Sequence, residues 1–128
     1  MNTSLTELQI AVMRVLWRRG AATVAEVQDE LRRDGRPLAQ TTVATLLTRL
    51  AKREVVGCRP QERPYVYEPR VTEVEVRGDV LNGVAEQLFE GDVAELVAHL
   101  LTAREVEPGD LARIREMIEA RERRVEED

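Results

Sequence analysis

The chain has 128 residues, 43% of them hydrophobic, and a net charge of −5 at pH 7. A chain of this length can bury one modest core, or a small domain plus an oligomerisation segment, but not two large catalytic domains. It has one cysteine, Cys58, one histidine, His99, and one serine, Ser4, so it lacks an intrachain disulfide, a His/Cys zinc site and a nucleophile with its base. We therefore expect no enzyme activity, no metal and no cofactor.

Charge is distributed unevenly along the chain. Residues 1–70 carry 12 basic and 8 acidic side chains, a net +4, whereas residues 71–128 carry 7 and 16, a net −9. A basic first half suits an anionic partner such as nucleic acid, and the acidic second half indicates a separate task. There is no apolar run of 18 residues and no signal-peptide pattern, so we expect a cytoplasmic protein without membrane insertion.

Two capping boxes mark the starts of the first two predicted helices. Thr6 with Gln9 opens "LQIAVMRVLW", and Thr23 with Glu26 opens "VAEVQDELRR". The first helix is apolar on two sides, which predicts a central place in the core. Its apolar positions are Leu8, Val12, Val15 and Leu16 on one side and Ile10, Met13 and Trp17 on the other. In the second helix, the inward positions are Val24, Val27 and Leu31.

The stretch "LAQTTVATLLTRLAKRE" predicts a third helix over residues 40–52, with a threonine-rich surface. The inward positions recur at helical spacing and are Val43, Leu46, Leu47 and Leu50. The opposite face consists of Thr41, Thr45, Thr48 and Lys52, flanked by Ala44 and Arg49. Threonine is a poor helix former, but its short side chain offers a hydroxyl and a methyl group to base edges in the major groove of DNA. In the alternative interpretation, Thr41 or Thr42 only caps the helix and Thr48 bonds back to the preceding turn.

Two short strands follow, "EVVGCRP" and "RPYVYEP", around a turn at residues 60–62. Three helices and a hairpin predict a winged helix-turn-helix domain over residues 1–70. Gln40 is a candidate for a bidentate contact to adenine, and Arg59 and Arg63 are candidates for phosphate or minor-groove contacts. For Tyr65 and Tyr67, packing is favoured over DNA contact. Cys58 is expected to be a small half-buried residue, with a redox switch as the minor alternative.

The second half predicts three more amphipathic helices. Thr72 and Asp92 cap the first two, Gly91 ends the earlier of these, and Pro108 starts the last. Their apolar stripes make a thin core for one chain, so we expect a second copy to complete it; the alternative is a monomeric helical subdomain packed on the winged helix. Two glycines inside the fourth helix, Gly78 and Gly83, suggest a bend or a close helix crossing.

The runs "VLWRRGAATVAEVQDEL", "TTVATLLTRLAKREVV" and "RPYVYEP" resemble the BlaI/MecI/CopY family of bacterial transcriptional repressors, the penicillinase repressor family. The matching positions are Trp17, Thr23 to Val27, Thr41 to Leu50, and Tyr67 to Pro69, and a weaker match continues at "EGDVAELVAHLL". The resemblance implies a homodimer that reads a palindromic DNA operator through residues 1–70 and dimerises through residues 71–128. The candidate DNA-binding residues are then Gln40, Thr41, Thr42, Ala44, Thr45, Thr48, Arg49, Lys52, Arg59 and Arg63. The candidate dimerisation residues are Val80, Leu81, Val84, Leu88, Phe89, Leu96, Leu100, Leu111, Ile114 and Ile118.

The resemblance also bears on regulation. In the β-lactam-responsive branch a protease cuts the dimerisation helix between Asn and Phe, and this chain has His99 and Leu100 at the aligned position, which is its candidate cleavage position. The copper-responsive branch carries Cys-x-Cys pairs near the C-terminus, and no cysteine follows Cys58 here, so direct metal sensing is not expected. Packing is favoured over sensing for His99. The competing function is a winged-helix adaptor that binds protein and not DNA.

Overall fold

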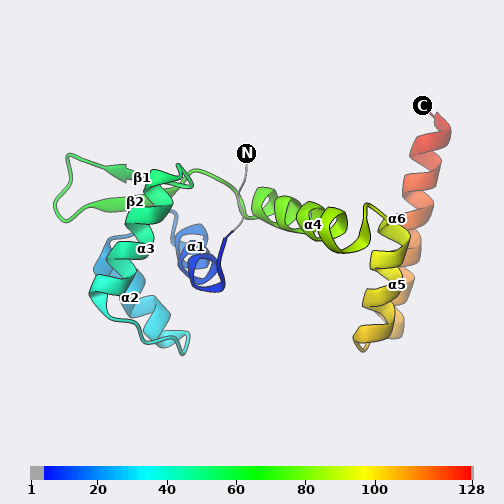
Figure 1. Cartoon of the computed structure of the whole chain (residues 1–128), viewed down its shortest axis with the longest axis horizontal. Coiled ribbons are helices and arrows are strands. Elements are labelled where there is room, and N and C mark those ends of the chain that lie inside the picture. Colours follow the sequence, from blue (N-terminus) through cyan, green and yellow to red (C-terminus); the bar gives the residue numbers. More distant parts are fainter. Residues whose placement is uncertain (1–4, 128) are drawn as a thin grey trace. The chain divides into compact units, whose positions relative to one another are not determined.

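The structure, a computed structural model, describes residues 5–127 and divides into two compact units after Gly83. Unit 1 contains, in chain order, α1 (Glu7–Arg19), α2 (Val24–Arg33), α3 (Gln40–Lys52), β1 (Val56–Arg59) and β2 (Val66–Pro69). Helix α4 (Glu73–Phe89) begins in unit 1 and ends in unit 2, where α5 (Val93–Ala103) and α6 (Pro108–Glu127) follow (Figure 1). The predicted fold class, mainly α with one small β-hairpin, is confirmed.

Side-chain caps start most of these helices where the sequence predicted. The capping boxes of Thr6 with Gln9 and of Thr23 with Glu26 are both complete, and Asp92 accepts a hydrogen bond from the backbone N–H of Glu95 at 3.0 Å. In the second box, the N–H of Thr23 donates to the carboxylate of Glu26 and holds the pKa of Glu26 below its usual range. Each cap satisfies N–H groups that have no partner inside the helix, so the helix boundaries are set locally.

The core of unit 1 lies between α1, α2, α3 and the hairpin. The buried residues of the three helices include all four predicted inward positions of α3, together with Val12, Met13, Val15, Leu16, Val27 and Leu31. Helix α1 is central, as its two apolar sides predicted. Leu8 is an exception, because it lies in the first turn of α1 and keeps 37% of its surface exposed.

The hairpin is tied to both ends of the helical core. Strands β1 and β2 are antiparallel, with Cys58 opposite Tyr67. The backbone groups of Tyr67 also exchange two hydrogen bonds with Ala22, which lies two residues before the start of α2. The indole N–H of Trp17 donates to the carbonyl of Val71 at 2.9 Å. These bonds fix the wing and the segment after it against α1.

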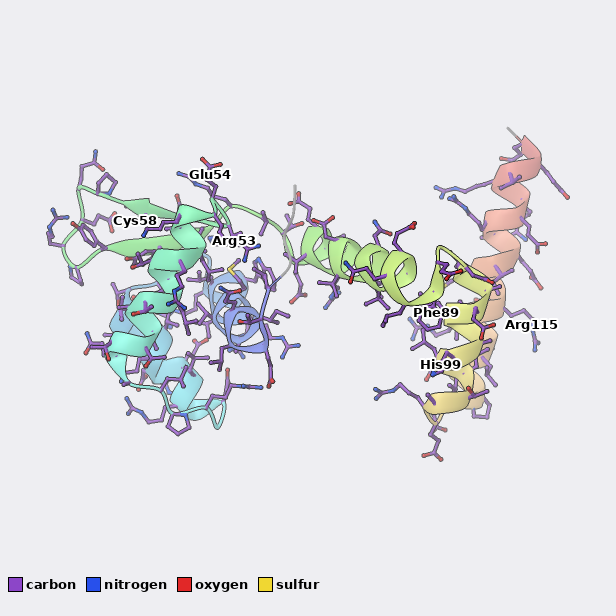
Figure 2. All side chains as sticks on the ribbon, in the orientation of Figure 1. Arg53, Glu54, Cys58, Phe89, His99 and Arg115 are labelled. Atoms are coloured by element: carbon purple, nitrogen blue, oxygen red, sulfur yellow. The ribbon has the colours of Figure 1, made fainter. Side chains whose placement is uncertain are left out.

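Unit 2 leaves its apolar residues largely uncovered. No described residue of α5 or α6 is buried. Leu88, Leu100, Leu111 and Ile118 keep 74%, 49%, 42% and 53% of their surface exposed. The apolar residues Leu111 and Ile118 of α6 are therefore not buried within one chain. One aromatic contact is formed, with the rings of Phe89 and His99 edge to face at 5.8 Å between centroids (Figure 2). The packing role favoured for His99 remains a prediction, because His99 makes this ring contact but is otherwise exposed.

The two glycines of α4 do not mark a crossing inside this chain. A β-carbon added at Gly78 or Gly83 would meet nothing within 4 Å, and α4 is assigned as one helix from Glu73 to Phe89. The expected close crossing is therefore not made within the described part of the single chain, and the expected bend remains a prediction. None of the helices in residues 5–127 is long and apolar enough to cross a bilayer.

Candidate nucleic-acid interface

The solvent-exposed face of helix α3 carries only uncharged and basic residues. Its residues Gln40, Thr41, Thr42, Thr45, Thr48, Arg49 and Lys52 are exposed and Ala44 is half-buried. We refer to these eight residues as the outer face of α3. Helix α3 contains no acidic residue at all, so nothing on this face would repel a phosphate. The structure places every candidate DNA-binding residue of the helix on this accessible surface, and their contact with DNA remains a prediction.

Two threonine hydroxyls of the outer face are already engaged within the helix. The hydroxyl of Thr45 donates to the carbonyl of Thr41 at 2.9 Å, and that of Thr48 donates to the carbonyl of Ala44 at 2.8 Å. The alternative considered for Thr48, a bond to the preceding turn, is therefore confirmed, and Thr45 does the same. A hydroxyl has one proton, so these two side chains offer outward a methyl group and an acceptor oxygen.

The N-terminus of α3 has no side-chain cap. Its N-cap residue is Ala39, which forms no capping hydrogen bond, so the capping role considered for Thr41 or Thr42 is wrong. The first-turn N–H groups of an uncapped helix keep their partial positive charge for an external anion. Backbone N–H groups in this position are typical phosphate ligands of DNA-binding helices.

The wing arginines are held by their neighbours. Arg59 pairs with the carboxylates of Glu68 and Glu62 at 2.9 and 3.5 Å, and the hydrogen bond to Glu68 is the main cause of its raised pKa. Arg63 donates to the backbone carbonyls of Pro60 and Glu62 at 2.7 and 3.1 Å. Both guanidinium groups remain exposed on the wing, but Arg59 is largely neutralised by its acidic neighbours, which the sequence reasoning did not foresee.

Tyr65 is a residue of this surface that the sequence reasoning missed. Packing was expected for both tyrosines; Tyr67 is buried at 7% exposure, whereas Tyr65 keeps 44% exposed and stacks under the guanidinium of Arg63 at 4.4 Å. The difference arises because β2 begins at Val66, which leaves Tyr65 in the loop of the wing. The preceding Arg63-Pro64 pair was the available signal that the strand had not yet begun.

A hollow of about 540 Å³ joins the wing to the start of α3. We call it the wing hollow; it is lined by Thr23, Val24, Ala25, Gln40, Thr41, Ala44, Arg63, Pro64 and Tyr65. The structure thus brings Gln40, Thr41 and Ala44 together with Arg63 on one concave, mostly apolar surface.

Beneath α3, Tyr67 of the second strand lies close to Thr48 of the helix and to Cys58 of the first strand. Cys58 lies on β1 and is half-buried, as expected (Figure 2). The pKa of the Tyr67 hydroxyl is raised, first by its burial and then by Cys58, while the nearby Thr48 acts in the opposite direction.

The described residues contain no candidate metal site. No group of three or more His, Cys, Asp or Glu side chains between residues 5 and 127 is arranged to hold a metal ion. His99 and Leu100, the candidate cleavage position, lie inside α5, where Leu100 is half exposed.

Three helices followed by a hairpin wing, with a basic and acid-free third helix facing outward, define the class of winged-helix DNA-binding proteins. Residues 5–120 match the family model of the penicillinase repressors. The chain is 22% identical over 107 residues to the penicillinase repressor of Staphylococcus aureus, a match that covers 84% of each protein. The chain belongs to the penicillinase repressor family, a family of DNA-binding transcriptional repressors and not of enzymes.

Solved structures agree with this assignment. The solution structure of the DNA-binding domain of the repressor BlaI matches with a TM-score of 0.50 and 26% identity, covering 57% of this chain and 88% of that domain. The complex structure of hsRosR-S4 matches with a TM-score of 0.51 and 17% identity, covering 77% and 95% of the two chains. The second match shows the fold alone. The resemblance drawn from the sequence is thereby confirmed.

Proposed function

We propose that this repressor binds a palindromic operator as a homodimer, with α3 of each copy in a major groove. The outer face of α3 carries this proposal, because it combines short side chains, a bidentate amide at Gln40 and two cations, Arg49 and Lys52, with no acidic group. The uncapped first turn of α3 and the wing hollow support it by offering phosphate-binding N–H groups and Arg63 beside the same end of the helix.

The second part of the proposal assigns DNA binding to residues 1–70 and dimerisation to residues 71–128. It is supported by the exposed apolar residues of unit 2, because stripes of leucine, isoleucine and valine on a soluble helix are normally covered by a partner. A second copy presents the same stripes, so a two-fold interface buries them reciprocally. The ten candidate dimerisation residues named from the sequence are the ones that we expect in this interface.

The test of DNA binding is selection of bound duplexes from a random pool by the purified full chain, with the selected duplexes re-bound at two salt concentrations. We expect a palindromic consensus with half-sites about 34 Å apart, or a multiple of it, and an affinity that falls steeply with salt. No enrichment by a folded protein would refute operator binding and favour the protein-binding adaptor.

Dimerisation is tested by measuring the molar mass of two single-substitution variants by light scattering. Ile118→Lys places a charge on the apolar stripe of α6 and should convert the dimer to a monomer. The control variant, Arg115→Lys, also introduces a lysine on α6, but at a position that is already basic. It should therefore leave the dimer intact. Unchanged dimers for Ile118→Lys would contradict the assignment of this stripe to the interface.

The third part of the proposal is cleavage by a regulatory protease at the bond between His99 and Leu100. Both residues lie within α5, and a protease must draw its substrate into an extended conformation. We therefore expect cleavage only where α5 unwinds locally, and substitutions that stabilise α5 should slow it. A cut elsewhere in an induced cell, mapped by mass spectrometry, would remove this position.

A further inference from the structure

A cavity of about 360 Å³ lies between α1 and the first part of α4, within unit 1. One wall is a single face of α1, formed by Ile10, Arg14 and Trp17 at helical spacing. The other is a single face of α4, formed by Glu73, Val76, Arg77, Val80 and Leu81. The cavity uses no residue of the outer face of α3, and it shares only Val80 and Leu81 with the ten candidate dimerisation residues.

The cavity exists because only the start of α4 is packed on the core. Val71 and Val76 are 8% and 4% exposed, and the indole of Trp17 is bonded to the carbonyl of Val71. One turn beyond Val76, Val80 is 39% exposed and Leu81 is 55% exposed. Apolar side chains thus line a concave space that no other described residue fills.

The charges around the cavity leave one cation available. Arg77 forms an ion pair with Glu73, at 2.8 Å between Nη2 and Oε1, so these two charges compensate each other. Arg14 lies on the opposite wall and makes no hydrogen bond or ion pair with any residue in the described range 5–127. A guanidinium at the rim of an apolar space is suited to a carboxylate, which it can bind with two parallel hydrogen bonds.

We propose that this cavity binds a small amphipathic carboxylate, with the carboxylate on Arg14 and the apolar body against Trp17, Val80 and Leu81. The volume is at the lower end of the range of small-molecule sites, and the composition, mostly apolar with few polar groups, is typical of them. A second copy of the chain fits less well, because the centres of protein interfaces are depleted in charged residues and this space has three of them at its walls.

Such a ligand bridges α1 of the winged helix to α4, which continues into unit 2. If the homodimer proposed above holds, restraining the start of α4 changes the operator affinity, and this regulatory step rests on that proposed function. By linkage, operator DNA then changes the affinity for the carboxylate by the same factor.

Trp17 is the only tryptophan of the chain and lines the cavity, so its emission reports binding directly. The full-length protein is titrated with octanoate and benzoate and with their uncharged counterparts octan-1-ol and benzamide, and calorimetry checks the binding. We expect saturable binding of at least one acid, at least tenfold tighter than its neutral counterpart. Arg14→Gln should lose at least tenfold in affinity, whereas Arg113→Gln, on α6, should bind like the unmodified protein.

Three results would overturn the proposed site. They are the absence of a saturable response to both acids, equal binding of the acids and the neutral compounds, and unchanged binding by Arg14→Gln with a wild-type circular dichroism spectrum. If Trp17 emission changes only when the protein is diluted, and not when acid is added, the cavity is occupied by a second copy. That result would also overturn the proposed site.

Operator binding is measured separately, without ligand and then with saturating acid. A shift of at least threefold supports the regulatory step, and acid binding without any shift refutes that step alone. Failure of the ligand-free protein to bind any selected DNA refutes the proposed function, while the Trp17 titration still decides whether the carboxylate site exists.

Discussion

Replacing Thr45 and Thr48 together distinguishes the two groups that each threonine offers to DNA. Their hydroxyl protons are committed to the carbonyls of Thr41 and Ala44 at 2.9 and 2.8 Å, so neither hydroxyl can donate to a base or phosphate without breaking a bond in α3. The methyl groups carry no such restraint. The Thr45→Val/Thr48→Val variant keeps a methyl in each place, and the Thr45→Ser/Thr48→Ser variant keeps only the hydroxyls.

We expect the serine variant to lose about 0.8 kcal/mol for each buried methyl group, or roughly fifteenfold in affinity for two. The valine variant should stay within about threefold of the unmodified protein, because only acceptor oxygens are lost. Fluorescence anisotropy on a labelled operator duplex measures both, with thermal melting of each variant as the control for folding. A tenfold loss for the valine variant beside an unaffected serine variant would show that the hydroxyls read the DNA and would refute the reasoning.

Three further predictions concern the interface and the core. Gln40→Ala should cost about 1–3 kcal/mol of operator-binding free energy and relax the sequence preference at one base position. Arg63→Ala should weaken binding to all DNA sequences alike and flatten the salt dependence of the affinity. Equal losses of affinity on operator and random DNA for both variants would contradict these roles. Burial raises the pKa of Tyr67, so the unfolded chain releases the hydroxyl proton at a lower pH than the folded chain, and the unfolding free energy falls as the pH rises above about 10. Tyr67→Phe should reduce that fall, as measured by urea titrations at several pH values. Identical pH profiles for the variant and the unmodified protein would contradict this prediction. Leu47→Ala, at a fully buried position, should cost about 2–5 kcal/mol of unfolding free energy, and Leu8→Ala, at 37% exposure, should cost less than half as much; similar losses at both positions would show that burial does not decide the cost.

The helices were predictable from the sequence because their ends are encoded within a few residues. Thr6, Thr23 and Asp92 each bond to an N–H three residues later, and this spacing is visible in the sequence. The predicted bounds of α3, residues 40–52, are those of the structure because Val43, Leu46, Leu47 and Leu50 all face one core.

The details of the candidate interface depended on contacts that no local pattern encodes. Arg59 meets Glu68 across the hairpin, and this pairing follows from the register of β1 and β2. The exposure of Tyr65 follows from the residue at which β2 begins. The cavity beside Trp17 depends on where α4 loses contact with α1, which is a tertiary property.

The uncapped N-terminus of α3 has a consequence for how this protein tolerates change. A Ser or Asp at position 39 would gain about 1 kcal/mol of stability by capping the helix, and position 39 is exposed, so neither side chain would meet steric resistance. The same oxygen would occupy the N–H groups that we assign to a phosphate. A population selected only for heat resistance should therefore accumulate Ala39→Ser and Ala39→Asp, and its members should repress less well. Stability and operator binding would then compete at a single backbone position.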